Sequence, residues 1–174
     1  MAYSVIAAQT YTVREFTRTP ADIASSMRRI KEIGYQAVEL AALGEIGTDE
    51  LKRIVDGVGL AVCARHVRFE RMRDDTDAVV AEQKLLGCKY AVIGVPPQEY
   101  RSADDYAKFA NDASEVAKKL TDQGITFAYH NHSFELEKFG ERTGLDVLYD
   151  ESTPEYFKGE IDTYWIQRGG GDPS

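Results

Sequence analysis

Along this chain, the spacing of hydrophobic and polar residues switches repeatedly between a pattern typical of strands and a pattern typical of helices. Short runs of β-branched and aromatic residues, typical of buried strands, are each followed by a longer amphipathic stretch, typical of a helix. The predicted strand and helix pairs are residues 4–10 with 20–34, 35–40 with 48–57, 60–67 with 74–87, 88–95 with 102–124 and 125–132 with 144–151, before a sixth strand at 157–165. This repeat predicts an α/β fold with a parallel sheet.

The predicted helices carry recognisable end signals. A glycine stands just before the next strand in four places, where a left-handed residue ends a helix: Gly34, Gly59, Gly87 and Gly124. A hydroxyl residue stands at three predicted helix starts, where it can cap free backbone N–H groups: Thr19, Thr48 and Ser102. These signals support the positions of the helices.

Periodicity alone fits both an open doubly wound sheet and a closed (β/α)₈ barrel, because both repeat a strand and a helix. The segment after the first strand, residues 8–12, contains no glycine. A glycine-rich phosphate loop is therefore absent from that position, which disfavours nucleotide binding.

Size and charge narrow the function classes. The 174 residues fit one domain, and the formal charge of −8 makes nucleic acid and anionic membranes unfavourable partners. No apolar run approaches the ~20 residues of a membrane span, and the first residues lack a signal-peptide pattern, so we expect a cytoplasmic protein.

The two cysteines, Cys63 and Cys88, lie in apolar runs and are predicted to be buried free thiols.

Histidines and carboxylates fall where the predicted strands end. His66 ends the third strand, His130 and His132 end the fifth, Glu39 ends the second, and Asp162 lies in the sixth. Parallel α/β folds place their sites at the carboxyl ends of strands, so these side chains are predicted to share one mouth. Imidazole with carboxylate is ligand chemistry for a divalent ion such as Mn²⁺, Co²⁺ or Zn²⁺.

Each of these residues also has a structural interpretation. His66 alone fits a hydrogen-bonded structural role better than a functional one, and Glu39 could be solvated beyond its strand. Polar side chains in a row at 129–132 (YHNH), and a carboxylate at Asp162 beside apolar neighbours, are costly to bury without a purpose, which favours function. Trp165 could stack on a sugar or could be an ordinary core residue.

Four segments together resemble the sugar phosphate isomerase/epimerase family, the xylose-isomerase-like TIM barrels that include ketose epimerases, inosose dehydratases and type IV AP endonucleases. They are 34–40 (GYQAVEL), 129–135 (YHNHSFE), 162–165 (DTYW) and 169–173 (GGGDP), with His66 on the third strand. The resemblance covers essentially the whole chain. It implies a (β/α)₈ TIM barrel and favours the closed barrel over the open sheet.

The resemblance also implies a divalent metal (Mn, Co, Zn or Mg) held by residues at the fifth to eighth strands. Asp162 matches the sixth-strand ligand, and Glu135 is the preferred fifth-strand ligand, with His130 as the alternative. Glu135 and His66 are the expected catalytic residues. The expected substrate contacts are Glu39, His130, His132 and Trp165.

The implied reaction removes a proton next to the carbonyl of a sugar, keto-sugar or cyclitol, giving an enediolate that the metal stabilises. Isomerisation, epimerisation and dehydration share this intermediate, so a dehydratase of the same barrel family remains an alternative. The DNA-repair branch is disfavoured by the charge of −8.

A full barrel needs about 250 residues, and this chain has 174, enough for about six βα units. We therefore expect one incomplete barrel domain, 1–174, without strands seven and eight and their two metal ligands. Such a fragment is expected to be catalytically impaired, with weak metal binding and no turnover, or to be a silent sugar-binding fragment. Its unpaired edge strands predict that the chain either forms a homo-oligomer through these strands or is poorly stable and aggregates.

Overall fold

The computed structural model describes residues 5–97, 100 and 103–174. The chain divides into two compact units, each with its own apolar core. The first unit comprises Met1–His66 and Ala81–Tyr90, and the second comprises Val67–Val80 and Ala91–Ser174.

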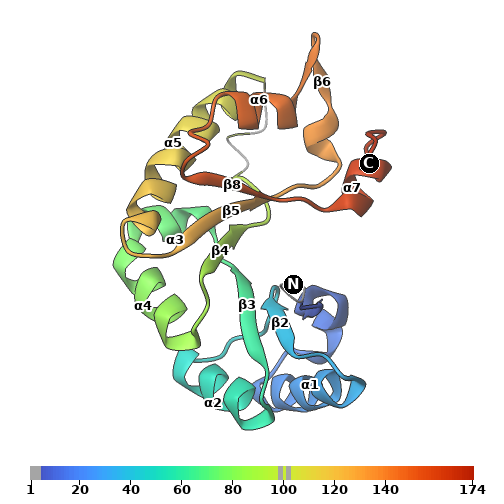
Figure 1. Cartoon of the computed structure of the whole chain (residues 1–174), viewed down its shortest axis with the longest axis vertical. Coiled ribbons are helices and arrows are strands. Elements are labelled where there is room, and N and C mark those ends of the chain that lie inside the picture. Colours follow the sequence, from blue (N-terminus) through green and yellow to red (C-terminus); the bar gives the residue numbers. More distant parts are fainter. Residues whose placement is uncertain (1–4, 98–99, 101–102) are drawn as a thin grey trace. The chain divides into compact units, whose positions relative to one another are not determined.

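The first unit alternates strands with helices (Figure 1). Its elements are β1 (Ala7–Gln9), η1 (Thr10–Phe16), α1 (Pro20–Ile33), β2 (Ala37–Leu40), α2 (Thr48–Val58) and β3 (Ala61–His66). The strands β1, β2 and β3 pair in parallel in this order, with Ala7 opposite Ala37 and Val38 opposite Val62. Parallel pairing brings the carboxyl ends of these strands to the same edge.

The core of the first unit lies between α1, α2 and the strands. Ile23, Met27 and Ile30 recur at helical spacing on α1 and are buried together with Val38 and Val62 of the strands. This burial stabilises the fold by about 25 cal/mol per Å² of apolar surface. It fixes the strand ends on which the polar residues stand.

Two elements begin in one unit and end in the other: α4 (Thr76–Leu86) and β4 (Tyr90–Ile93). The other elements of the second unit are α3 (Phe69–Asp74), α5 (Ala103–Thr121), β5 (Thr126–His130), η3 (Phe134–Leu136), β6 (Lys138–Phe139), β7 (Arg142–Thr143), α6 (Gly144–Asp150), β8 (Phe157–Glu160) and α7 (Thr163–Arg168).

In the second unit, β4, β5 and β8 follow one another in the strand order, and β5 and β8 pair in parallel from Phe127↔Phe157 to His130↔Glu160. Helices α5 and α6 lie side by side (Figure 1). The core is rich in aromatic rings, among them Phe109, which packs against Tyr129 with ring centroids 6.1 Å apart.

Strands occupy the six predicted positions, and helices alternate with them, so the α/β prediction is confirmed. The four glycines before the strands all have positive φ, from 68° at Gly87 to 116° at Gly34. The structure adds a short antiparallel β6–β7 pair, which the periodicity does not reveal.

The predicted sixth strand at 157–165 is too long. Strand β8 ends at Glu160, and α7 begins at Thr163 because the Asp162 side chain accepts a hydrogen bond of 3.1 Å from the Trp165 backbone N–H. An aspartate at this position caps a helix and ends the strand. Asp162 therefore lies just beyond β8 and not within it.

The three predicted capping hydroxyls differ in outcome. Thr19 is confirmed, because it forms a reciprocal capping box with Asp22. The prediction for Thr48 is wrong: Gly47 takes the extended cap position, and Thr48 is the first residue of α2. Ser102 lies outside the described residues.

Neither cysteine forms a disulfide, as predicted; Cys88 is buried as predicted, whereas Cys63 is only half-buried, so the burial predicted for Cys63 is wrong. Burial raises the pKa of the Cys88 thiol. Among the described residues, no helix has the length and apolar character needed to cross a membrane.

Candidate functional site

A hydrogen-bonded group stands at the carboxyl ends of β1, β2 and β3 in the first unit. Oε1 of Glu39 accepts a hydrogen bond of 2.8 Å from Nε2 of Gln9 and lies 2.7 Å from Nε2 of His66. The Gln9 and Glu39 positions are direct register partners, so the strand pairing itself sets this contact. The Glu39 carboxylate is therefore held in place by two neighbours.

Gln9 was not predicted from the sequence. Its signal is a long polar side chain at the end of a strand otherwise built from Ala7 and Ala8. A half-buried amide at the end of this strand is stabilised by a hydrogen-bond partner, and Glu39 supplies it.

A pocket of about 300 Å³ opens beside His66, between the ends of β2 and β3. The loop after β2 forms its wall, and Thr10 fixes that loop: its buried hydroxyl donates to the Ala41 carbonyl and accepts from the Ala41 N–H, both at 2.7 Å. The next residue, Ala42, has a φ of 54°, in the left-handed region that residues other than glycine seldom adopt. The pocket wall is thus held in a set conformation.

His130 in the second unit stands between two carboxylates. Its Nδ1 lies 2.9 Å from Oε1 of Glu160, its register partner on β8, and its Nε2 lies 3.6 Å from Oδ2 of Asp162. The His130 side chain is nearly buried, with 8% of its surface exposed, whereas the Glu160 and Asp162 side chains are 26% and 27% exposed. One nitrogen is within hydrogen-bond distance of Glu160, while the other faces Asp162 beyond that distance.

This arrangement fits a divalent cation. Ligating histidines usually donate their second ring N–H to a carboxylate, which fixes the tautomer, and Glu160 stands in that position. The remaining nitrogen of His130 and Oδ2 of Asp162 are the donor types that bind Zn²⁺, Mn²⁺ or Co²⁺. The sequence did not predict Glu160 as a site residue, and its contact with His130 comes from the pairing of β5 with β8.

Glu135 is buried away from this pair. The Tyr129 hydroxyl donates to its Oε1 and the His132 backbone N–H donates to its Oε2, both at 2.8 Å. Burial raises the pKa of Glu135, and burial together with this carboxyl raises the pKa of Tyr129 well above its ordinary value. With both oxygens engaged, the geometry favours His130 over Glu135 as the fifth-strand ligand.

Aromatic rings gather next to His130. His132 stacks on Phe134, with centroids 5.7 Å apart and planes at 11°, and its ring lies 5.3 Å from that of Trp165. Trp165 is only partly buried, so it is not an ordinary core residue. Such rings offer apolar faces to the C–H groups of a sugar.

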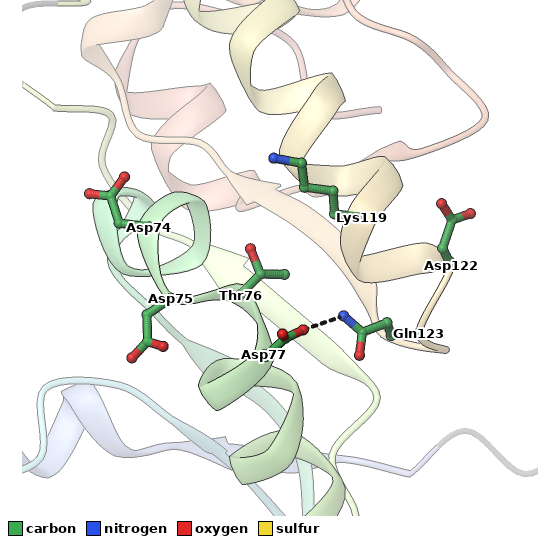
Figure 2. A pocket seen from close by; sticks show the side chains of 7 residues that line it. All are labelled: Asp74, Asp75, Thr76, Asp77, Lys119, Asp122 and Gln123. Atoms are coloured by element: carbon green, nitrogen blue, oxygen red, sulfur yellow. Dashed lines mark hydrogen bonds between the residues drawn. The ribbon is translucent and has the colours of Figure 1, made fainter.

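A larger surface pocket, of about 500 Å³, lies elsewhere in the second unit (Figure 2). It is lined by polar and charged side chains: Asp74, Asp75, Thr76, Asp77, Lys119, Asp122 and Gln123. Gln123 donates a hydrogen bond of 2.9 Å to Asp77 (Figure 2). Within the described part of the chain, no three of its acids bring carboxylate oxygens within 4.8 Å of one another, and none of the predicted site residues lines it.

Solved structures share this architecture. A sugar phosphate isomerase/epimerase from Parabacteroides distasonis ATCC 8503 matches with a TM-score of 0.82 and 22% identity, over 98% of this chain and 73% of its own. The chain has the fold of a xylose-isomerase-like TIM barrel. It corresponds to part of such a barrel, because it spans 73% of this neighbour's length.

Other barrels with this fold have different activities. L-ribulose 3-epimerase matches with a TM-score of 0.70 and 13% identity, over 95% of this chain and 63% of its own. The probable 3-DHS dehydratase AsbF from Bacillus anthracis matches with a TM-score of 0.68 and 14% identity, over 98% and 67%. An AP endonuclease from Brucella melitensis also shares the fold. No family model and no curated protein matches the sequence.

The structure brings the predicted site residues together in two groups. Glu39 and His66 meet in the first unit, whereas His130, Asp162, His132 and Trp165 gather in the second. Each group stands at the carboxyl ends of its own strands, as predicted. The expectation that both groups share one mouth stays a prediction.

Proposed function

We propose that this chain carries the substrate- and metal-binding edge of a divalent-metal-dependent sugar isomerase or epimerase. The observation that carries the proposal is His130, oriented by Glu160 through Nδ1 and facing Oδ2 of Asp162 through Nε2. His130 and Asp162 would hold the ion. When bound, a divalent cation polarises a carbonyl and stabilises the negative charge that develops after loss of the adjacent proton.

The chain's own residues would bind and orient the sugar. The rings of His132 and Trp165 would contact its C–H groups, since the His132 ring lies 5.1 Å from that of His130 and 5.3 Å from that of Trp165, and both residues are half-buried. The Glu39 and His66 pair would hold hydroxyl groups, and Nδ1 of His66 would move the proton, because the carboxylate in contact with Nε2 orients the imidazole for acid–base work. The substrate class is a sugar, keto-sugar or cyclitol.

Glu135 has a different proposed role. Its buried carboxylate accepts from the backbone N–H of His132 and so holds the loop that follows β5. It would support the presentation of His132 without contacting the metal.

The test is a titration of the whole chain with Co²⁺ and Zn²⁺, followed by incubation with a panel of pentuloses, hexuloses and ketocyclitols in D₂O. We expect His130→Gln and Asp162→Asn each to lower the affinity for the metal tenfold or more, which is about the usual effect of disturbing a metal site. Asp122→Asn, in the acidic surface pocket, is the control and is expected to bind as the parent does.

Deuterium uptake next to the carbonyl reports proton removal, whether the product is an isomer, an epimer or a dehydrated sugar. Metal-dependent uptake supports the enzyme. Metal and sugar binding without uptake supports the alternative of a silent sugar-binding fragment. If the parent chain binds neither metal nor sugar, the proposal is wrong.

A further inference from the structure

Asn131 lies between the two histidines of the site, and its side chain is fully buried. It follows β5 directly, at the point where the backbone pairing of β5 with β8 ends at His130↔Glu160. A buried amide needs partners for its donor and acceptor groups.

Both partners of Asn131 belong to the backbone of one residue. Its Nδ2 donates a hydrogen bond of 3.2 Å to the Asp162 carbonyl, and its Oδ1 accepts one of 2.8 Å from the Asp162 N–H. The side-chain amide thus contacts the backbone in the manner of one more rung of the β5–β8 ladder. Asp162 is held from both sides of its Cα.

The side chain of Asp162 is divided between two tasks. Its Oδ1 accepts from the Trp165 N–H at the start of α7, and its Oδ2 faces Nε2 of His130. With the backbone fixed by Asn131 and Oδ1 fixed by the helix, Oδ2 is left to face His130.

We propose that Asn131 is a positioning residue, which holds Asp162 so that Oδ2 and the His130 imidazole together form the ligand pair of the site. The inference rests on the proposed function for its ligand, a divalent cation. In the metal-free protein, Asn131 also protects two backbone N–H groups from exchange with solvent. It binds the Asp162 N–H directly, and by holding Asp162 it keeps the acceptor of the Trp165 N–H in place.

Asn131→Leu removes both hydrogen bonds at similar volume, and Asn131→Asp keeps the acceptor while losing the donor. Asn111 supplies a matched control, because its amide makes one exposed hydrogen bond, to the Ala107 carbonyl on α5. Hydrogen exchange of the metal-free proteins, followed by NMR, is expected to show at least tenfold faster exchange at Asp162 and Trp165 in Asn131→Leu. In Asn131→Leu, the Gly159 amide on β8 is expected to exchange as in the parent. In the control Asn111→Leu, the Asp162 and Trp165 amides are also expected to exchange as in the parent.

The second measurement is titration of the same proteins with Co²⁺, read from its visible absorption bands. Asn131→Leu is expected to bind about tenfold to a hundredfold more weakly and with an altered spectrum, as is usual when an outer-shell partner is lost. Asn131→Asp is expected to fall between Asn131→Leu and the parent. Bands and affinity that match the parent in Asn131→Leu would overturn the proposal.

The two measurements separate this inference from the proposed function. A parent chain that takes up no Co²⁺ contradicts the metal site. Faster exchange at Asp162 in Asn131→Leu would then still support the positioning of Asp162, and unchanged exchange would overturn it.

Discussion

The Tyr129 hydroxyl donates a hydrogen bond of 2.8 Å to Oε1 of Glu135, and both side chains are fully buried. Burial raises the pKa of the Glu135 carboxyl, so the folded protein retains this proton to a higher pH than the unfolded chain does. The contribution of Glu135 to stability is therefore greatest below the ordinary carboxyl pKa and falls as the pH rises through the raised value.

Tyr129→Phe is expected to lower the free energy of unfolding by about 1–3 kcal/mol at neutral pH, because it leaves a buried carboxylate oxygen without its donor. Losing that donor raises the pKa of Glu135 further, so the loss should be larger at pH 7 than at about pH 4, near the ordinary carboxyl pKa. Urea unfolding at the two pH values measures it. Tyr164→Phe, on an exposed side chain, is the control, and equal losses at both pH values would contradict the prediction.

Thr19 and Thr48 should differ when each is replaced by alanine. Thr19 accepts from the Asp22 N–H and belongs to a capping box, so Thr19→Ala is expected to cost about 1 kcal/mol of unfolding free energy. Thr48 is the first residue of α2 and not its cap, so Thr48→Ala should change stability by less than about 0.5 kcal/mol. Chemical denaturation compares them, and similar losses would argue against this assignment of the helix start.

Two helical glycines should respond in opposite directions to alanine. At Gly144, the first residue of α6, a Cβ would meet the Tyr106 ring at 2.6 Å, and Gly144→Ala is expected to cost about 1–3 kcal/mol through overpacking. At Gly57 in α2 a Cβ meets nothing within 4 Å, and Gly57→Ala is expected to stabilise by about 0.5–1 kcal/mol. Thermal unfolding of both variants is the measurement. A stabilised Gly144→Ala would show that the Tyr106 ring moves aside readily.

Glu39 and His66 should be energetically coupled. Their contact of 2.7 Å lies at the ends of neighbouring strands, and coupling between contacting residues is typically about 0.5–3 kcal/mol. A double-mutant cycle of Glu39→Gln and His66→Asn, followed by urea unfolding, gives the coupling energy. Glu39→Gln combined with Thr48→Ala should be additive, and additivity within the Glu39–His66 cycle would contradict a preformed pair.

The sequence by itself determined the alternation of strands and helices, because hydrophobic period and glycine end signals are local properties. It also placed His66 and His130 at the carboxyl ends of their strands, since parallel strands with helical crossovers bring those ends to one edge. The resemblance of the 129–135 and 162–165 segments to xylose-isomerase-like barrels agreed with the fold of the solved neighbours.

Only the tertiary structure decided which polar atoms meet. Register between β1 and β2 joined Gln9 to Glu39, and the pairing of β5 with β8 set Glu160 against His130. Glu135 and Asn131 are polar residues near the same strand end, but the fold turned one toward Tyr129 and the other toward the Asp162 backbone. Such contacts join residues about thirty positions apart or depend on a turn after the strand, and no local pattern encodes them.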